Sequence, residues 1–442
     1  MLKTLRNAFK VKDVRDRLLY MFAMLVVIRI GSQLPIPGVD TSFFKELFAS
    51  QNNDAFGFFN AMTGSSFTNM SVFALSITPY ITSSIIMQLL TIAIPKLEEM
   101  QKDGEDGRKK IAEYTRYVTV ALALLQSVAM AVGFGNQGFL LEFNPLNVVI
   151  VVVTMTAGSA LLMWIGERIT EKGVGNGISI VLLINILSSI PADISTLYTR
   201  FIGVEGQPVA VSVVAAIIII AVIVAVMVFV VVLQDGERRI PVQYSKKMQG
   251  RKMVGGQASV IPLKVNTAGV IPVIFASSIM SFPVVIAQFF GDKVNYDSIG
   301  GHILMGLNSS NWFKPDRPAY SVGLIVYILL IVVFAYFYTS ITFNPLEVAN
   351  NMKKSGGFIP GIRPGKPTSD YLNSILNYLV FIGACGLIII CIIPIMVSGL
   401  FNVSRLSFGG TSLIIIVSVT LETIKAVESK MLVRYYKGFL ND

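Results

Sequence analysis

Ten apolar stretches divide this 442-residue chain, and they constrain its fold more than any other feature of the sequence. Each is long enough, or nearly so, to cross the roughly 30 Å hydrocarbon layer of a membrane as a helix. Residues 213–232 contain no charged side chain and form the clearest of these stretches. The predicted spans are residues 18–36, 72–94, 117–135, 148–166, 177–198, 209–233, 266–290, 320–343, 372–396 and 411–427.

The composition supports a membrane protein. Hydrophobic residues make up 53% of the chain and charged residues 14%, whereas soluble domains usually carry about 25% charged residues. So much apolar surface cannot be hidden in a soluble core, which excludes a water-soluble enzyme. The two cysteines and one histidine exclude a disulfide framework, a cysteine-rich zinc site and a His–Glu–His zinc motif.

Lysine and arginine are distributed unevenly over the two sides of the predicted spans. If the N-terminus is cytoplasmic, 29 of the 36 lie on that side, six lie opposite, and Arg29 lies within the first span. Cytoplasmic loops of membrane proteins carry such an excess of basic residues. We therefore expect both termini in the cytoplasm. The mixed basic and apolar residues before the first span predict either an amphipathic helix on the bilayer surface or a disordered tail.

Five predicted spans lie in each half of the chain, which we divide into residues 1–200 and 201–442. If the halves share a fold, an odd number of spans per half requires them to be inverted relative to each other, with a path at their interface. The second span of each half contains internal prolines, namely Pro79 in one, and Pro272 and Pro283 in the other. Such helices either line a path or are ordinary kinked helices packed on their neighbours.

Motifs for catalysis, cofactor binding and metal binding are missing, so we expect neither an enzyme nor a cofactor. Gly365-Lys366 lacks the rest of a nucleotide-binding loop, and Gly173–Gly177 is more typical of a flexible helix start than of a phosphate cradle. Glu422 and Lys425 are the only candidates we find for a proton relay, and snorkelling toward the headgroups explains them better. Any energy source must therefore be another protein or a gradient.

Two further features depart from the pattern of apolar spans and polar loops. The apolar segment 55–64, in the outer loop 37–71, is too short to span; it either dips into the membrane or packs on the outer surface. Gln88, Gln126 and Asn266 place amides within three spans. Because a buried amide is costly unless it is hydrogen-bonded, these either bond across helices or form a separable polar seam.

Two long inner loops, residues 234–265 and 344–371, are basic. Anionic lipid would attract either loop. Their length and their embedded prolines and glycines favour shaped loops that dock a partner, such as a ribosome or an acidic protein surface. From topology alone, a small-solute secondary transporter is the second candidate, and a membrane-embedded enzyme is the third. A transporter needs a polar substrate site at the membrane midplane, and an enzyme needs a catalytic set; the sequence offers little for either.

Several ordered motifs resemble one known family over nearly the whole chain, from Asp16 to Tyr436. The matching stretches are Phe73–Ile81, Gly107–Arg116, Gly175–Ser179, Pro262–Pro272, Lys353–Gly356, Phe358–Gly365 and Phe408–Ser412. The chain resembles the SecY family, the channel subunits of the Sec protein translocase. This resemblance implies an all-α polytopic membrane protein of ten transmembrane helices, in two inverted five-helix halves around a central hourglass pore.

The resemblance also implies a ring of aliphatic side chains at the narrowest point of that pore. The matched positions are Ile77, Ile81, Ile178, Leu182, Ile274 and Ile415. Leucine stands at one position where the family often has isoleucine. A narrow aliphatic constriction resists wetting and so blocks hydrated ions, yet it can deform around a passing polypeptide. Two pairs in the ring are spaced four residues apart, on one helix face; core packing alone would produce the same spacing.

A plug on the outer side of the ring is the family feature that matches about residues 56–69, and it favours the dipping alternative. Its candidate side chains are Phe56, Phe58, Phe59, Met62 and Phe67. The family also opens sideways into lipid, between spans two and three on one side and spans seven and eight on the other. The three amides, Gln88, Gln126 and Asn266, fall at this lateral gate.

The resemblance implies a function and a set of partners as well. The channel would translocate unfolded secretory polypeptides and release transmembrane segments into lipid, in a bacterial plasma membrane. Its partners would be the small membrane subunits SecE and SecG, the motor ATPase SecA, the ribosome, signal sequences and membrane lipid. The residues expected to dock the motor or the ribosome are Arg238, Arg239, Lys246, Lys247, Arg251, Lys252 and, foremost, Arg363.

Overall fold

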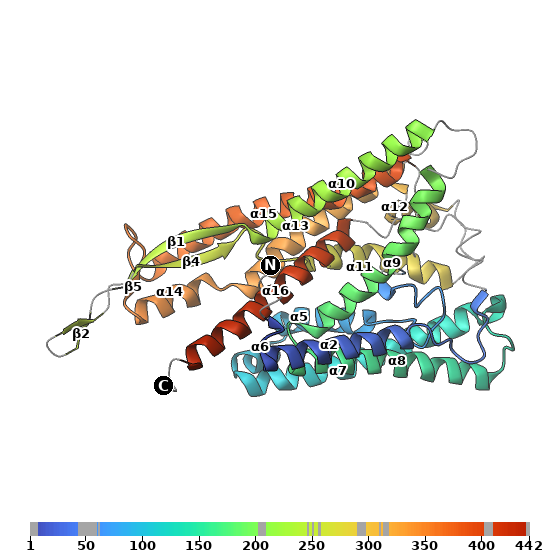
Figure 1. Cartoon of the computed structure of the whole chain (residues 1–442), viewed down its shortest axis with the longest axis horizontal. Coiled ribbons are helices and arrows are strands. Elements are labelled where there is room, and N and C mark those ends of the chain that lie inside the picture. Colours follow the sequence, from blue (N-terminus) through green and yellow to red (C-terminus); the bar gives the residue numbers. More distant parts are fainter. Residues whose placement is uncertain are drawn as a thin grey trace.

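A computed structural model of the chain shows a bundle of long helices, from one end of which β-strands project (Figure 1). The structure describes residues 8–42, 60, 62–201, 209–244, 247–249, 252–254, 258–289, 298–308, 311–312, 318–401 and 410–438. We call the end that carries the strands the ribbon end. The predominance of helix confirms the predicted fold class.

Each of the ten predicted spans overlaps one helix. In the first half the helices are α2 (Lys12–Gly31), α5 (Thr78–Ala93), α6 (Pro95–Lys102), α7 (Glu105–Phe134), η1 (Gly135–Phe139), α8 (Pro145–Lys172) and α9 (Gly177–Phe201). In the second half they are α10 (Val209–Asp235), α11 (Ile271–Phe289), α12 (Ile299–Leu307), η4 (Pro318–Ser321), α13 (Val322–Thr342), α14 (Pro345–Lys354), α15 (Lys366–Phe401) and α16 (Gly410–Gly438). The spans are α2, α5, α7, α8, α9, α10, α11, α13, α15 and α16.

Length and composition identify a multi-pass membrane protein. Six of the described helices are long and apolar enough to cross a membrane, and α5 together with α6, which is bent away from it by 102°, would make a seventh. The six lie in α7, α8, α9, α10, α13 and α15. The remaining predicted spans, in α2, α11 and α16, are helical.

The second span of each half begins differently from the prediction. Pro79 and Pro272 do not interrupt a helix: each is the second residue of its helix, in α5 and α11. Proline is tolerated in the first turn because the N–H that it lacks has no helical partner there. The preceding residues form turns instead of helix, and each turn contains a residue with positive φ, Ser76 (52°) and Gly269 (64°). Pro283 does lie inside α11, as predicted.

The two halves meet along two seams. On one side α9 packs against α10 and α16, and α2 also contacts α16; on the other side α7 contacts α11. Arg17 and Lys430, from opposite halves, both donate to the carbonyl oxygen of Gly173 at the end of α8, over 3.4 and 2.8 Å. Burial and the neighbouring arginine lower the pKa of Lys430. The first seam is thus fastened at its ribbon end.

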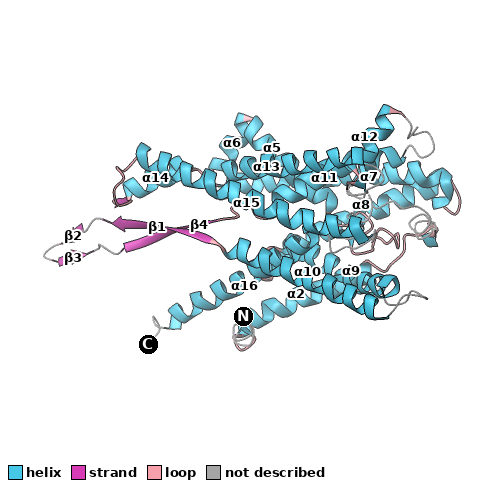
Figure 2. Cartoon of the chain, turned by 90° about the horizontal axis from the view of Figure 1, so that it is seen from above, coloured by secondary structure: helices cyan, strands magenta, loops and turns pink. Residues whose placement is uncertain are grey.

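The inner loops form strands, which the sequence pattern did not predict. β1 (Glu237–Tyr244) pairs with β4 (Ala258–Lys264) and with the short β5 (Gly357–Phe358), both antiparallel. A second hairpin, β2 (Lys247–Gln249) with β3 (Lys252–Val254), extends the ribbon outward (Figure 2). The sheet order β4-β1-β5 joins the two basic loops into one surface.

Candidate functional site

The six predicted ring residues converge in one hydrophobic cluster between the halves. Ile77, Leu182, Ile274 and Ile415 are buried, and the other two, Ile81 and Ile178, are partly buried and pack against them. They come from the start of α5 and from α9, α11 and α16, so that both halves contribute. The cluster includes residues of α2, α5, α8, α9, α11 and α16.

Helix starts and glycines place these side chains. Ile77 caps α5, and its carbonyl oxygen accepts from the backbone N–H of Ile81. At the start of α9 the Asn176 side chain accepts from the backbone N–H groups of Ile178 and Ser179. The predicted helix start at Gly173–Gly177 is therefore confirmed. A Cβ on Gly177 would lie 2.0 Å from the Gly166 carbonyl oxygen, so glycine is needed for α8 and α9 to approach this closely.

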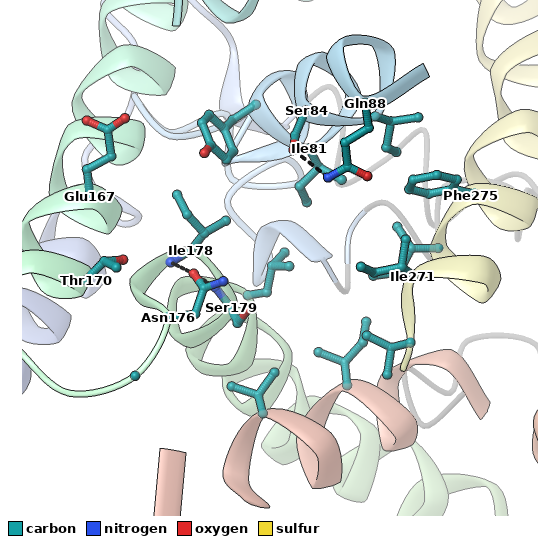
Figure 3. A pocket seen from close by; sticks show the side chains of 18 of the residues that line it. Ile81, Ser84, Gln88, Glu167, Thr170, Asn176, Ile178, Ser179, Ile271 and Phe275 are labelled. Carbon is teal, nitrogen blue, oxygen red and sulfur yellow. Dashed lines mark hydrogen bonds between the residues drawn. The ribbon is translucent and has the colours of Figure 1, made fainter. Parts of the chain in front are cut away.

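A cavity of about 1130 Å³ lies on one side of the ring. Five of the ring residues line it, all but Ile77, and Figure 3 shows Ile178 and Ile271 projecting into it from opposite sides. Its wall toward the ribbon end is polar, with side chains from α7, α8 and the start of α9. The polar and charged wall residues include Arg116, Glu167, Arg168, Thr170, Glu171 and Asn176.

Ion pairs organise the charged wall. Arg116 Nε on α7 lies 2.8 Å from Glu167 Oε1 on α8, and Arg168 Nη1 lies 2.7 Å from Glu171 Oε2. Arg168 also lies over the ring of Trp164, 5.5 Å from its centroid. The cavity is therefore lined by charged, water-compatible groups at one end and by the aliphatic ring at the other.

The segment before α5 closes the other side of the ring. Met62 is buried in the same cluster as the ring, whereas Phe67 is buried in a neighbouring cluster with residues of α7 and α8. Asn185 lies one helical turn beyond Leu182 on α9, away from the cavity; its Nδ2 donates to the Met62 carbonyl oxygen over 3.2 Å and to Ser76 Oγ over 3.0 Å. The other predicted plug residues, Phe56, Phe58 and Phe59, lie outside the described residues.

The three predicted gate amides have separate hydrogen-bonding surroundings. Gln88 lines the cavity, and its Nε2 contacts Ser84 Oγ on its own helix over 3.5 Å (Figure 3). Asn266 is buried and donates to the carbonyl oxygen of Gly269 in its own turn over 2.9 Å. The Oε1 atom of Gln126 is buried and has no partner among the described residues. No described hydrogen bond joins them, although α7 and α11 are in contact.

Five of the seven predicted docking residues are described by the structure, and these five lie at the ribbon end. Arg238 and Arg239 are exposed on β1, and Arg239 pairs with Glu237 over 2.6 Å. Arg363 is exposed between β5 and α15, and its carbonyl oxygen accepts from Thr368. The backbones of Lys247 and Lys252 lie in the outer hairpin. Lys246 and Arg251 fall outside the described residues.

Sequence reasoning missed the polar groups beneath the ring. Asn185 is buried, with 2% of its surface exposed, and Ser188 lies one turn further along α9. Arg29 reaches this region from α2, and its Nη1 lies 3.0 Å from Ser188 Oγ. An ionisable residue within a membrane helix is a functional candidate by default, so Arg29 carried a signal that could have been used.

Two helical halves, with a cavity between them that has one polar wall and ends at an aliphatic cluster, fit a membrane channel. A family model described as SecY matches residues 71–424. The protein translocase subunit SecY of Streptomyces galbus is 43% identical and that of Halalkalibacterium halodurans 41% identical, each match covering all of both chains. The chain belongs to the SecY family; it is a protein-conducting channel subunit and not an enzyme.

Solved structures share the fold. "The structure of a protein conducting channel" superimposes with a TM-score of 0.63 at 18% identity, covering 95% of this chain and 93% of the other. The structure described as "The plug domain of the SecY protein stablizes the closed state of the translocation channel and maintains a membrane seal" gives 0.61 at 19% identity, covering 95% and 92%. "Sec61 in the Canine ribosome-channel complex from the endoplasmic reticulum" gives 0.60 at 17% identity, covering 95% and 93%.

Proposed function

We propose that unfolded secretory polypeptides pass from the cavity through the ring of Ile77, Ile81, Ile178, Leu182, Ile274 and Ile415. The observation that carries the proposal is the convergence of these six side chains, from both halves, at the end of a cavity that has one polar wall. Each charged side chain costs about 2.5–3.5 kcal/mol at the centre of a membrane helix, so a secretory chain needs an aqueous route. The aliphatic ring keeps that route dry while it is idle.

The predicted segment 56–69, described at residue 60 and residues 62–69, is the proposed plug, and Met62 and Phe67 are among its buried side chains. Its packing against α9 on the far side of the ring from the cavity supports this role. It adds a second barrier to the aliphatic ring, and it must leave its seat when a polypeptide passes. The relative described above as having a plug that maintains a membrane seal has the same fold.

Sideways release is proposed between α5 and α7 on one side and α11 and α13 on the other. Gln88 faces the cavity at this seam, and the buried Oε1 of Gln126 lacks a described partner in this state. An apolar signal sequence that separates α7 from α11 gains lipid contact, and the amides of Gln88, Gln126 and Asn266 set how easily the helices part.

The ribbon end is the proposed docking site for a motor ATPase, SecA, and for the ribosome. One sheet unites the two basic loops; Arg238 and Arg239 are exposed on it, and Arg363 is exposed in the segment that follows β5. An exposed basic surface attracts ribosomal RNA or an acidic protein face. We also propose small membrane partners of the SecE and SecG kind, a bacterial plasma membrane and cytoplasmic termini, the last from the excess of basic residues on one side.

Crosslinking tests the route directly. A cysteine at Ile81 or Ile274, in a chain whose native Cys385 and Cys391 are replaced by alanine, should crosslink to a translocating precursor stalled by a folded domain at its end. Val153→Cys, on an exposed position of α8, is the matched lipid-facing control. Crosslinks at both ring positions and none at the control are expected; equal crosslinking at all three, or none at the ring, would contradict the proposed route.

A further inference from the structure

The backbone beneath the ring is held in an unfavourable conformation. Ser65, Met70 and Ser76 all have positive φ, at 64°, 41° and 52°. Non-glycine residues rarely adopt such angles. Each such residue costs free energy, which contacts with the surrounding structure must offset. Something other than local preference must therefore keep the segment 62–76 seated.

Polar groups of α2 and α9 supply that restraint. Arg29 Nη1 lies 3.5 Å from the Gly64 carbonyl oxygen, and Ser188 Oγ lies 3.4 Å from the same oxygen. Ser188 also accepts from Arg29 and donates to the Asn185 carbonyl oxygen over 2.6 Å. Two groups, Arg29 of α2 and Ser188 of α9, thus lie at one carbonyl of the proposed plug. Because the single hydrogen of the Ser188 hydroxyl is donated to Asn185, Arg29 is the donor to that carbonyl.

Gly64 is needed for this arrangement. A Cβ there would lie 2.9 Å from backbone atoms of Asn185, and its φ of +62° is one that residues with a side chain rarely adopt. The plug backbone therefore rests directly on α9. Its contact is made through main-chain carbonyls, which do not depend on the plug's own side chains.

The Arg29 guanidinium is suited to a bond that must break. Among the described residues it forms no ion pair, so its charge is directed at a carbonyl and a hydroxyl oxygen rather than at a carboxylate. A hydrogen bond to a charged group is stronger than a neutral one. It is nevertheless easier to break than a buried ion pair, because breaking it leaves no opposite charge without a partner.

We propose that Arg29, held in position by Ser188, is a latch that keeps the plug in its closed seat by donating to the Gly64 carbonyl oxygen. This inference rests on the proposed sealing role of the plug segment 56–69. When a polypeptide displaces the plug, Arg29 and Ser188 remain together on α2 and α9 and are ready to receive it again. The latch sets the fraction of idle channels whose plug is unseated.

The test uses the full channel complex reconstituted in phospholipid vesicles, with Cys385 and Cys391 replaced by alanine and Ser66→Cys as a reporter. Ser66 is buried in the plug, so its substituted thiol reacts with a membrane-impermeant maleimide only when the plug leaves its seat. Ion efflux from the vesicles is measured in parallel. Loss of a hydrogen bond to a charged group predicts a rise of roughly tenfold in labelling rate and in efflux for Arg29→Met.

Matched variants separate the latch from general damage. Arg29→Lys, which keeps the charge and a donor, should restore a large part of the closed behaviour, and Arg15→Met, an exposed position on the same helix, should leave it unchanged. Ser188→Ala should raise labelling in the same direction as Arg29→Met, and it replaces that variant if the complex fails to assemble.

Deletion of residues 56–69 distinguishes the two levels of the proposal. If the deletion raises efflux and neither Arg29→Met nor Ser188→Ala changes labelling or efflux, the latch is wrong and the seal stands. If the deletion itself leaves efflux unchanged, the sealing role is wrong, and the latch falls with it. Raised labelling in both latch variants, with partial rescue by Arg29→Lys, supports the latch.

Discussion

The turns that precede α5 and α11 are counterparts in the two halves, yet they are held in different ways. In each half the fourth predicted span presents a glycine to the turn: a Cβ on Gly158 of α8 would lie 2.0 Å from the Val72 carbonyl oxygen, and one on Gly383 of α15 would lie 2.6 Å from that of Val265. The equivalence supports the proposed inverted repeat. Neither glycine suggested a packing role from sequence alone.

The difference lies in the remaining contacts. The turn in the first half is bound by side chains from other helices, through Ser159 to the Ser76 carbonyl oxygen and through Asn185 to Ser76 Oγ. The turn in the second half is bound within itself and to its own half, through Asn266 to Gly269 and through the backbone of Val265 to Gly236. The first arrangement suits a part that is released and recaptured, and the second suits a fixed wall.

The largest expected effect breaks the shared feature of both turns. Gly158→Ala and Gly383→Ala each force a methyl group against a backbone carbonyl, which should cost roughly 1–3 kcal/mol through overpacking. The thermal unfolding midpoint of the detergent-solubilised complex should fall for both. Gly300→Ala, where the nearest atom to the added Cβ is 3.8 Å away, is the control, and its unfolding midpoint should not change. An unchanged midpoint for Gly383→Ala would show that the second turn is not a close-packed counterpart of the first.

The next effect asks whether each half contributes equally to the seal. Ile81→Asn in the first half or Ile274→Asn in the second introduces a hydrogen-bonding group at the constriction and should wet it. Ion efflux through idle channels in vesicles should rise several-fold for either variant, while Val153→Asn on the exposed face of α8 should leave efflux unchanged. A leak from one half only would show that the ring is not shared.

The third effect separates docking from sealing. Arg363→Glu reverses a charge on the exposed ribbon end of the second half and should abolish motor-driven transport, without changing resting ion efflux or membrane insertion of the chain. Protease-protected precursor and efflux are measured on the same vesicles. Arg15→Glu, also exposed, is the matched control. Loss of folding or a raised leak in Arg363→Glu would argue against a docking role.

The smallest expected effect concerns the second turn itself. Asn266→Leu removes the bond to Gly269 and one amide of the proposed lateral gate, so the helices should part with a different threshold. Transport of precursors with weakened signal sequences, compared with that of a normal precursor, measures this threshold. Unchanged stringency would remove the gate role of Asn266 and leave it as a turn-forming residue.

Much of the fold was predictable because the signals lie within short stretches of chain. Apolar length marked all ten helices, and the motif resemblance selected the six ring residues that the structure brings into one cluster. The starts of α5 and α11 were misplaced because proline is equally compatible with a helix kink and with a first helical turn. The pairing of β1 with β5 was missed because it joins segments that lie more than 100 residues apart in the sequence.

The sequence by itself determined the number and order of the apolar spans and the side on which the basic residues lie, because hydrophobicity and charge are properties of the residues themselves. Tertiary structure alone decided that Ile77, Ile178, Ile274 and Ile415 meet beside a polar cavity. It alone brought Arg29 to the Gly64 carbonyl oxygen. These contacts depend on the close approach of helices that are distant in sequence. Glycines and turns permit that approach, and they leave no periodic pattern in the sequence from which it could be predicted.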